Sequence, residues 1–309
     1  MTAKKDVSAY ILSPAEAYEA RRAADQWEKD APKLYWCNET LGRVLSPMIP
    51  GDFVGVMGYT GNGKTALALA QAYFEARKLL RDGMDTRASV AYYTWDQPAE
   101  ALERKIERML MRDLKLTPEK YKLAHRLQLP LWWGGKNKFH QRKNNYRVPP
   151  LTLELIDDVL AEIVGSDKKP ALVVVDYVQR IPLQKESERS DTVLRAAERL
   201  ADFAARNDVT MLMTIQAARA VMTRQNKIPL IHEAQWSSGI EQACDKLIAL
   251  WRPATTEKEG TPITMDGRIY PTDQILMTGC VWKDREGETN REFAFPYDMA
   301  QSMIGDYPQ

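Results

Sequence analysis

The sequence predicts an α/β fold in which a mostly parallel, twisted sheet is flanked by helices. Short apolar runs of strand length alternate with longer segments that repeat apolar residues at helical spacing, which is typical of βαβ units. The chain has 309 residues, enough for one large domain or two small ones with a proper core. No internal repeat and no low-complexity segment interrupts the alternation.

The composition excludes several classes of protein. Lys plus Arg number 43 and Asp plus Glu 42, so the net charge is +1 and any nucleic acid would have to meet a local basic patch. The apolar fraction of 44% and charged fraction of 28% argue against wholesale disorder. No apolar run approaches the roughly 18 residues of a membrane span, and none follows residues 1–6 as in a secretory signal. We therefore expect a cytoplasmic protein without a membrane partner.

The cysteines and histidines offer no framework for a disulfide or a metal. Cys37, Cys244 and Cys280 are odd in number and widely spaced, and no two of the three histidines stand at metal-ligand spacing. We expect free thiols in a reducing compartment and no zinc site.

The N-terminal segment predicts one isolated helix. Residues 13–16, SPAE, form a capping-box pattern with proline at the first helical position, and the helix is expected to end near Lys29. Its apolar face is thin, so it either lies on another surface, in this chain or a neighbouring subunit, or is a frayed surface helix. We take residues 1–45 as an N-terminal arm or linker helix and residues 46–309 as the main domain.

From residue 51 onward strands and helices alternate. The predicted strands cover residues 52–57, 89–93, 171–175, 209–215, 246–251, 274–282 and 291–295. The predicted helices cover residues 66–78, 100–114, 151–164 and 191–206. Residues 136–147 carry five basic residues and no acid, and form either a solvated loop or a loop that contacts phosphates. Trp132 and Trp133 are either core residues or a stacking platform.

Residues 58–65, GYTGNGKT, match the pattern GxxxxGK[ST] in full, between a predicted strand and a predicted helix. Its glycines let backbone amides wrap phosphate oxygens, and the helix directs its positive end at the anion. Lys64 would supply a charge to the β and γ phosphates, and Thr65 a hydroxyl to Mg²⁺. The motif predicts a nucleotide-binding loop. Its expected contact residues are Gly58, Thr60, Gly61, Asn62, Gly63, Lys64 and Thr65.

Polar residues follow three of the predicted strands at one edge of the sheet. Asp176 ends an all-apolar strand, where α/β sheets place their ligands, and is expected to hold Mg²⁺ directly or through water. Asp96 is a candidate base or water-positioning residue, and Gln216 a candidate sensor of the γ-phosphate. The alternative for each is an ordinary polar residue at a strand end or in a loop.

Six segments, taken in order, resemble the ATPase domain of DnaB-type replicative helicases, within the RecA-like ring motors. They are residues 50–70 (PGDFVGVMGYTGNGKTALALA), 93–98 (YTWDQP), 172–181 (LVVVDYVQRI), 214–219 (TIQAAR), 237–253 (SSGIEQACDKLIALWRP) and 281–287 (VWKDREG). The resemblance runs from about residue 40 to residue 298. It implies a RecA-like P-loop NTPase core that binds ATP and Mg²⁺.

The resemblance also implies roles for residues in the catalytic motifs. Asp96 takes the place of the family's catalytic glutamate, with a side chain one methylene shorter. Lys283 and Arg285 stand where the family has a lysine and an arginine finger that reach the neighbouring subunit's nucleotide.

The channel loop departs from the family pattern. Gln235 and Trp236 occupy positions where the family usually has an arginine and a glutamate. In the same loop Arg219, Arg224 and Lys227 are expected to contact DNA instead. Trp236 either stacks on a base or packs between subunits.

This reading predicts an ATP-dependent helicase or translocase that acts on single-stranded DNA as a homo-oligomeric ring, expected to be a hexamer. Only about 45 residues precede the core, so the family's large primase-interacting domain is not expected, and the helix at residues 14–30 would act as the linker helix. A loader or primase is a candidate partner, and a phage or other mobile element a candidate source. Two alternatives stay open: a filament-forming RecA/RadA-like recombination or remodelling ATPase, and a regulatory or loader ATPase that presents a protein-binding surface.

Overall fold

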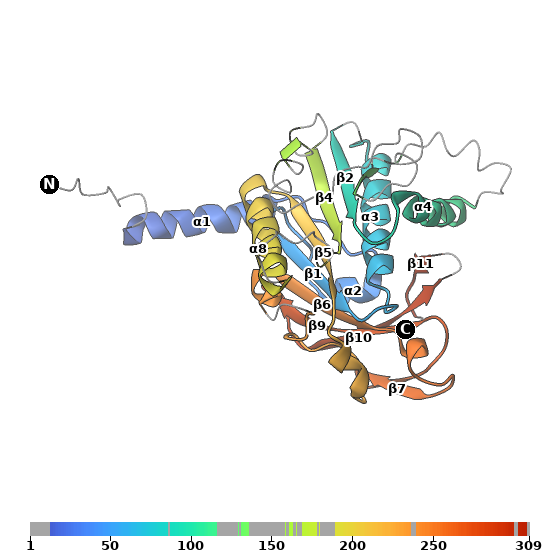
Figure 1. Cartoon of the computed structure of the whole chain (residues 1–309). Coiled ribbons are helices and arrows are strands. Elements are labelled where there is room, and N and C mark those ends of the chain that lie inside the picture. The colour runs from blue at the N-terminus through green and yellow to red at the C-terminus, as the bar shows by residue number, and fades with distance from the viewer. Residues whose placement is uncertain are drawn as a thin grey trace. The chain divides into compact units, whose positions relative to one another are not determined.

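The computed structural model describes residues 13–85, 87–115, 129, 131–135, 158, 161–162, 165, 169–177, 179, 189–235, 239–299 and 302–307 (Figure 1). The chain forms two compact units, Met1–Lys33 and Leu34–Gln309. The first contains α1 (Pro14–Asp30), and its predicted capping box is confirmed. The Glu16 amide donates to Ser13 Oγ at 3.3 Å, and the Ser13 amide donates to the Glu16 carboxylate at 2.7 Å. Both bonds satisfy amides that a helix start leaves without a partner.

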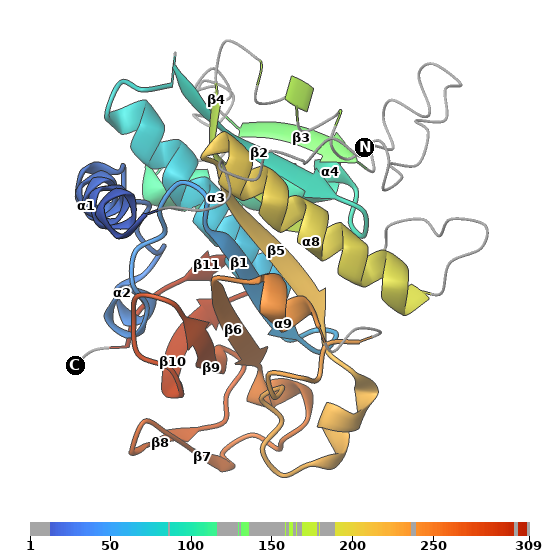
Figure 2. The same ribbon diagram turned by 90° about the vertical axis from the view of Figure 1, so that its left-hand side faces the viewer.

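The second unit is built on a mixed sheet. Among the described residues the sheet has nine strands in the order β11-β10-β9-β6-β1-β5-β4-β2-β3. Strands β1 to β6 are mutually parallel, and β9, β10 and β11 add an antiparallel edge next to β6 (Figure 2). The predicted α/β class with a mostly parallel sheet is therefore confirmed.

The elements of this unit have the following bounds. Its strands are β1 (Phe53–Gly58), β2 (Ala88–Thr94), β3 (Leu131–Gly135), β4 (Lys169–Asp176), β5 (Thr210–Gln216), β6 (Lys246–Trp251), β9 (Leu276–Asp284), β10 (Arg291–Asp298) and β11 (Met303–Ile304), with a separate hairpin of β7 (Pro262–Met265) and β8 (Arg268–Pro271). Its helices are α2 (Glu39–Val44), α3 (Lys64–Arg81), α4 (Ala99–Asp113), α8 (Arg189–Asn207) and α9 (Ile240–Ala243), with 3₁₀ turns η3 (Arg219–Thr223) and η4 (Pro253–Thr255).

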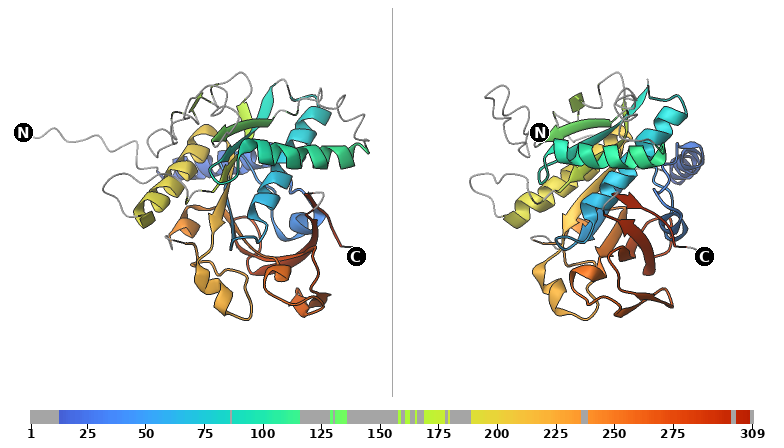
Figure 3. Two further views of the ribbon diagram at one scale, coloured as in Figure 1. Left: turned by 45° about the vertical axis from the view of Figure 1, so that its right-hand side comes forward. Right: turned by 90° about the vertical axis from the view of Figure 1, so that its right-hand side faces the viewer.

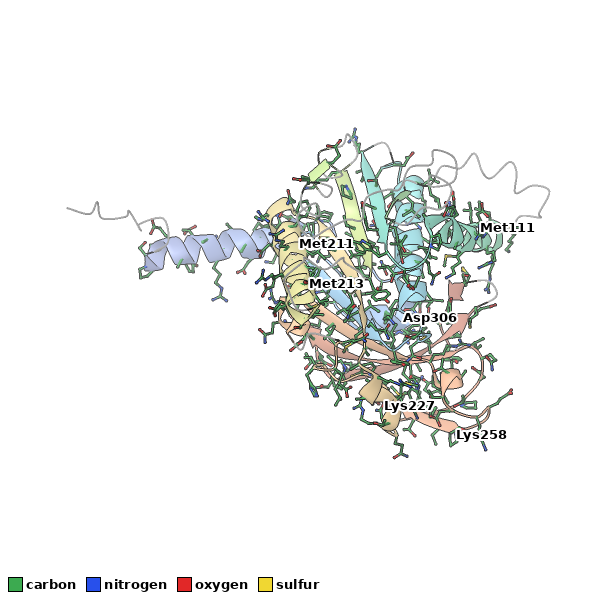
Figure 4. The ribbon with its side chains drawn as sticks, viewed as in Figure 1. Met111, Met211, Met213, Lys227, Lys258 and Asp306 are labelled. Carbon is green, nitrogen blue, oxygen red and sulfur yellow. The ribbon has the colours of Figure 1, made fainter. Side chains whose placement is uncertain are left out.

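The hydrophobic core lies on both faces of the sheet. Along β5, Met211 and Met213 belong to the cluster under α8, whereas Leu212 belongs to the cluster under α3 and α4 (Figures 3 and 4). Side chains alternate between the faces of a strand, so both faces of β5 must be apolar. Every residue of β1 and β5 is buried, which explains why both parallel strands are mostly apolar, although β5 also buries Thr210, Thr214 and Gln216.

The predicted strands and the described helices agree with the observed elements to within a few residues. Six of the helices and strands were not predicted: α2, α9, β3, β7, β8 and β11. Of these, α2 has six residues and β11 two, too few to show a periodicity, while β7 and β8 are four-residue strands exposed on one side. The predicted helix at 151–164, apart from a few residues, and the basic segment 136–147 lie outside the described residues, as do the side chains of Trp132 and Trp133.

Candidate functional site

The loop between β1 and α3 has the backbone that a phosphate-binding loop requires. β1 ends at Gly58 and α3 begins at Lys64. Gly61 and Gly63 adopt φ angles of +82° and +81°, in the left-handed region that favours glycine. A β-carbon at Gly63 would also clash with the Met277 side chain. No side chain caps the first turn of α3 among the described residues, so its amides face the loop.

Lys64 is held inside this loop. Its side chain is buried, and Nζ donates to Gly58 O at 2.8 Å, Tyr59 O at 3.1 Å and Gln216 Oε1 at 2.9 Å. Burial lowers the pKa of Lys64 to about 8, although the nearby charges of Asp176 and Asp96 oppose that shift. The ammonium group is thus already desolvated and aimed along the loop.

Asp176 lies at the end of β4, directly beside the loop. Its carboxylate is fully buried, and Oδ1 accepts from Thr214 Oγ1 at 2.6 Å while Oδ2 accepts from the Tyr92 hydroxyl at 3.0 Å. The Thr65 side chain also hydrogen-bonds to this carboxylate. Burial raises the pKa of Asp176, and the three hydroxyls and the charge of Lys64 counteract that shift. The structure therefore brings Thr65 and Asp176 together, as a shared metal site requires.

Gln216 and Asp96 complete this edge of the sheet. Gln216 ends β5, and besides accepting from Lys64 it donates through Nε2 to Thr60 Oγ1 at 3.1 Å. Asp96 follows β2, and its charge acts on Lys64, so the two lie in the same electrostatic environment. The amide of Trp95 donates to Asp176 O at 2.8 Å, which ties the Asp96 segment to β4.

Asn62 connects the loop to the segment after β6. Its side chain is 1% exposed, and Oδ1 accepts from the Arg252 amide at 3.3 Å and from Thr255 Oγ1 at 3.1 Å. Its Nδ2 is buried without a hydrogen-bond partner among the described residues. A buried donor of this kind costs free energy unless a partner is supplied.

The residues at this edge fit a nucleotide with a divalent cation. Among the described residues no group of three His, Cys, Asp or Glu side chains could hold a metal. Mg²⁺ in phosphate sites characteristically takes one or two carboxylates, with the remaining ligands from phosphates and water. Thr65 and Asp176 offer hard oxygen ligands of that kind, and the free amides of α3 and Asn62 Nδ2 offer donors to phosphate oxygens.

Lys283 and Arg285 lie at the other end of the strands, near the amino end of β6. Lys283 pairs with Leu247 at the amino end of β6, and its Nζ donates to Glu241 O at 3.0 Å. Arg285 forms an ion pair with Asp245, just before β6. Leu247 pairs with Gly55 of the adjacent β1, and the phosphate loop follows Gly58, about 10 Å further along the strand direction. The structure does not bring these two residues to the chain's own phosphate loop.

The loop that follows β5 holds its basic residues in different environments. Arg219 is exposed. Arg224 forms an ion pair with Glu233 at 2.7 Å, and Lys227, labelled in Figure 4, pairs with Glu257 at 2.5 Å beneath the Trp251 ring. Trp236 lies outside the described residues.

Sequence reasoning missed three residues of this site. Tyr92 and Thr214 supply hydroxyls to Asp176, and Gln179 binds the main chain of Gln216. Tyr92 and Thr214 are hydroxyl-bearing residues that stand next to apolar residues of predicted strands. That signal could have marked them, because a buried hydroxyl needs a partner.

Cys37, Cys244 and Cys280 are free thiols, and burial raises the pKa of each to about 12. Within the part of the chain that the structure describes, no helix is long and apolar enough to cross a membrane.

The fold and the loop define the class of protein, an α/β P-loop protein. The chain belongs to the DnaB-like helicase C-terminal domain family, whose model matches residues 38–301. The resemblance noted in the sequence is therefore confirmed at the level of the family.

Curated relatives are named replicative DNA helicase DnaB. The protein from Mycoplasma pneumoniae is 23% identical over 97% of this chain and 64% of its own length. The protein from Helicobacter pylori is 22% identical over 79% of this chain and 51% of its own, and that from Geobacillus stearothermophilus 25% identical over 69% and 45%. The chain thus spans less than two thirds of the length of these relatives.

Solved structures show the same fold. A solved ATPase domain superposes with a TM-score of 0.70 at 16% identity, covering 96% of this chain and 100% of that chain. A DnaB-like replicative helicase studied with primase gives 0.67 at 17% identity, covering 94% of this chain and 66% of its own. The RadB recombinase gives 0.52 at 17% identity, covering 88% and 98%. These likenesses support the predicted RecA-like core.

Proposed function

We propose that this chain is the ATPase part of a DNA helicase or translocase, which hydrolyses ATP between identical subunits of a ring, with six subunits as the expected number. The proposal rests on one observation: the candidate catalytic residues lie at two separate ends of the strands. Lys64 and Asp176 lie at one end and Arg285 at the other. An arginine finger in that position meets a nucleotide only when the nucleotide belongs to a neighbouring subunit. Each chain therefore contributes one half to each of two different sites.

The residues of the P-loop edge then have distinct roles. Lys64 places its charge against the β and γ phosphates, and Gln216 senses the γ-phosphate through the side chain that now binds Lys64. Thr65 and Asp176 would hold Mg²⁺, which, when bound, neutralises phosphate charge. Asp96 orients the attacking water, with a shorter reach than a glutamate would have.

The loop after β5 is the proposed DNA contact. Exposed Arg219 is placed to meet a phosphate directly. Arg224 and Lys227 contribute to DNA binding by exchanging Glu233 and Glu257 for phosphates. Trp236 would add base stacking. Because this contact is local, a chain of net charge +1 is compatible with DNA binding.

Partners follow from the same proposal. α1 exposes Trp27 at 45%, a large apolar side chain available for docking on an adjacent subunit. Residues 1–45 would then be the arm that links subunits, and residues 46–309 the ATPase domain. A DnaB-like relative is described together with its interactions with primase, so we propose a primase or a loader as a further partner. We also propose that the protein is cytoplasmic.

The decisive experiment mixes two inactive proteins. Arg285→Ala should bind ATP almost normally and hydrolyse it about 10³–10⁵-fold more slowly, the range seen for fingers supplied in trans. Mixed with Asp176→Asn protein, it should regain activity at interfaces that combine its intact P-loop edge with the partner's intact finger. Absence of rescue at every ratio would contradict the shared site. Arg268→Ala, at an exposed arginine on β8, is the matched control and should keep full activity.

Two further assays separate this function from its alternatives. ATP-driven unwinding of a forked duplex distinguishes a motor from a regulatory or loader ATPase, which would not unwind. Particle images with ATP and single-stranded DNA distinguish a closed ring from a RecA/RadA-like filament.

A further inference from the structure

The buried side chain of Gln179, which follows β4, forms hydrogen bonds with the main chain of Gln216. Its side chain is fully buried, three residues beyond Asp176. Gln179 Oε1 accepts from the Gln216 amide at 3.1 Å, and Nε2 donates to Gln216 O at 3.1 Å. Nε2 also lies 3.5 Å from Gln235 O, at the long limit of a hydrogen bond. One side chain thus satisfies both backbone groups of Gln216.

Gln216 in turn faces two regions. Its side chain accepts from Lys64 and donates to Thr60, both in the phosphate loop. Its carbonyl oxygen accepts from Gln179 and also from the Gln235 amide at 2.8 Å. The side chain of Gln216 therefore contacts the phosphate loop, while its backbone is bonded to Gln235, the last residue of the loop at residues 217–235.

Both ends of the loop at residues 217–235 meet at this junction. Ala217 forms a β-bridge with Ala234, and the Ala218 amide donates to Glu233 O at 2.8 Å. Gln179 lies behind these bonds, away from solvent, where hydrogen bonds do not exchange readily with water. If Gln216 shifted, both ends of this loop would move with it.

We propose that Gln179 is a positioning residue that makes the Gln216 backbone and the returning loop segment move as one unit, so that a change at the phosphates reaches the loop at residues 217–235. The inference rests on the proposed function, in which Gln216 senses the γ-phosphate and this loop contacts DNA. Glutamine suits the role because one amide group both donates and accepts. Glutamate would accept but not donate, and leucine would do neither.

The test follows hydrogen exchange of backbone amides in wild-type protein with ADP or a non-hydrolysable ATP analogue. The Gln216 amide reports the bond to Gln179, and the Gln235 amide reports the bond to Gln216. The two exchange rates should change together between nucleotides, by about 5-fold or more, as expected for coupled sites. A change at Gln235 without one at Gln216, or no change at either, would overturn the inference.

Variants then remove the coupling. Gln179→Glu and Gln179→Leu should still bind both nucleotides, yet show the same loop exchange with either. A nucleotide response kept at the wild-type size in a folded variant would overturn the inference. If both variants fail to fold, the absence of a coupled change in wild type would still overturn the inference.

Gln71 is the matched control. It is also fully buried, and its amide group likewise accepts from a backbone amide, that of Cys37, and donates to a backbone carbonyl, that of Tyr35. Gln71→Glu should therefore cost similar stability and leave the loop response intact. Loss of the response in Gln71→Glu as well would show that general loosening, and not Gln179, is responsible, and would overturn the inference.

A parallel binding assay keeps the two proposals apart. Labelled oligo-dT is titrated with wild-type protein in each nucleotide. If it does not bind, the proposed DNA function fails, whereas the exchange data still test Gln179. If it binds, Gln179→Glu should bring the ratio of the two affinities toward one; a ratio unchanged from wild type would overturn the inference.

Discussion

Replacing Thr214 with valine tests whether Asp176 is held as a buried carboxylate. Valine has nearly the shape of threonine, so the change removes the hydroxyl without opening a cavity. Thr214 Oγ1 donates to Asp176 Oδ1 at 2.6 Å, and both residues are fully buried. No water can replace the lost donor at that depth without rearrangement.

The expected cost follows from the charge on the acceptor. A hydrogen bond to a charged group contributes about 1.5–3 kcal/mol, whereas a bond between neutral groups contributes about 0.5–1.5 kcal/mol. Thr278 supplies the neutral reference, because its buried hydroxyl donates to Trp251 O at 2.9 Å. Thr214→Val should therefore destabilise the protein about twice as much as Thr278→Val.

The assay is urea unfolding of both variants and of wild type, with circular dichroism as the signal. With about 2–4 °C per kcal/mol for a chain of this size class, Thr214→Val should also lower the melting temperature by about 3–12 °C. Equal losses in the two variants would refute the reasoning, since they would mean that the Asp176 carboxyl is neutral in the folded protein.

Three further outcomes are expected. Lys64→Ala should weaken ATP binding by about 10- to 150-fold in calorimetry, because a charge-assisted bond to phosphate is lost; unchanged affinity would contradict the P-loop assignment. Arg219→Ala should reduce the salt dependence of single-stranded DNA binding by about 0.7 in the log–log slope, and an unchanged slope would remove this residue from the contact. Asp284→Asn should destabilise the protein by about 3 kcal/mol, because buried Lys246 keeps only Asp52 as a partner. Burial would raise the pKa of Asp284, but bonds from Ser46 and the charge of Lys246 bring it below its ordinary value of 3.8. The stabilisation is thus present above pH 3.8 and lost as the pH falls through the lower folded pKa, so the difference between Asp284→Asn and wild type in unfolding should shrink in acid.

Predictions from sequence succeeded where a segment carries its own signal. The capping box at Ser13 lies within four residues, and the strands β1 and β5 are largely apolar because both of their faces are covered. The P-loop is similar, since its glycines are required by local φ angles. Short elements such as α2 gave no signal because six residues do not complete two helical turns.

Pairings between distant segments escaped the sequence. Gln179 and Gln216 are 37 residues apart, and Tyr92 and Asp176 are 84 apart, and nothing in their local patterns names the partner. The same holds for Arg224 and Lys227, whose carboxylate partners are set by how the loop folds. Strand direction and register decided that Lys283 and Arg285 lie away from the P-loop.

Short sequence patterns therefore determined the chemistry of the phosphate loop and the class of fold, because backbone conformation and hydrophobic periodicity act over a few residues. The environment of each functional group was decided by tertiary structure, because burial and hydrogen-bond partners depend on which strands become neighbours. Asp176 illustrates both. Its place after an apolar strand was visible in the sequence, whereas the three hydroxyls that hold its carboxylate come from β2, α3 and β5.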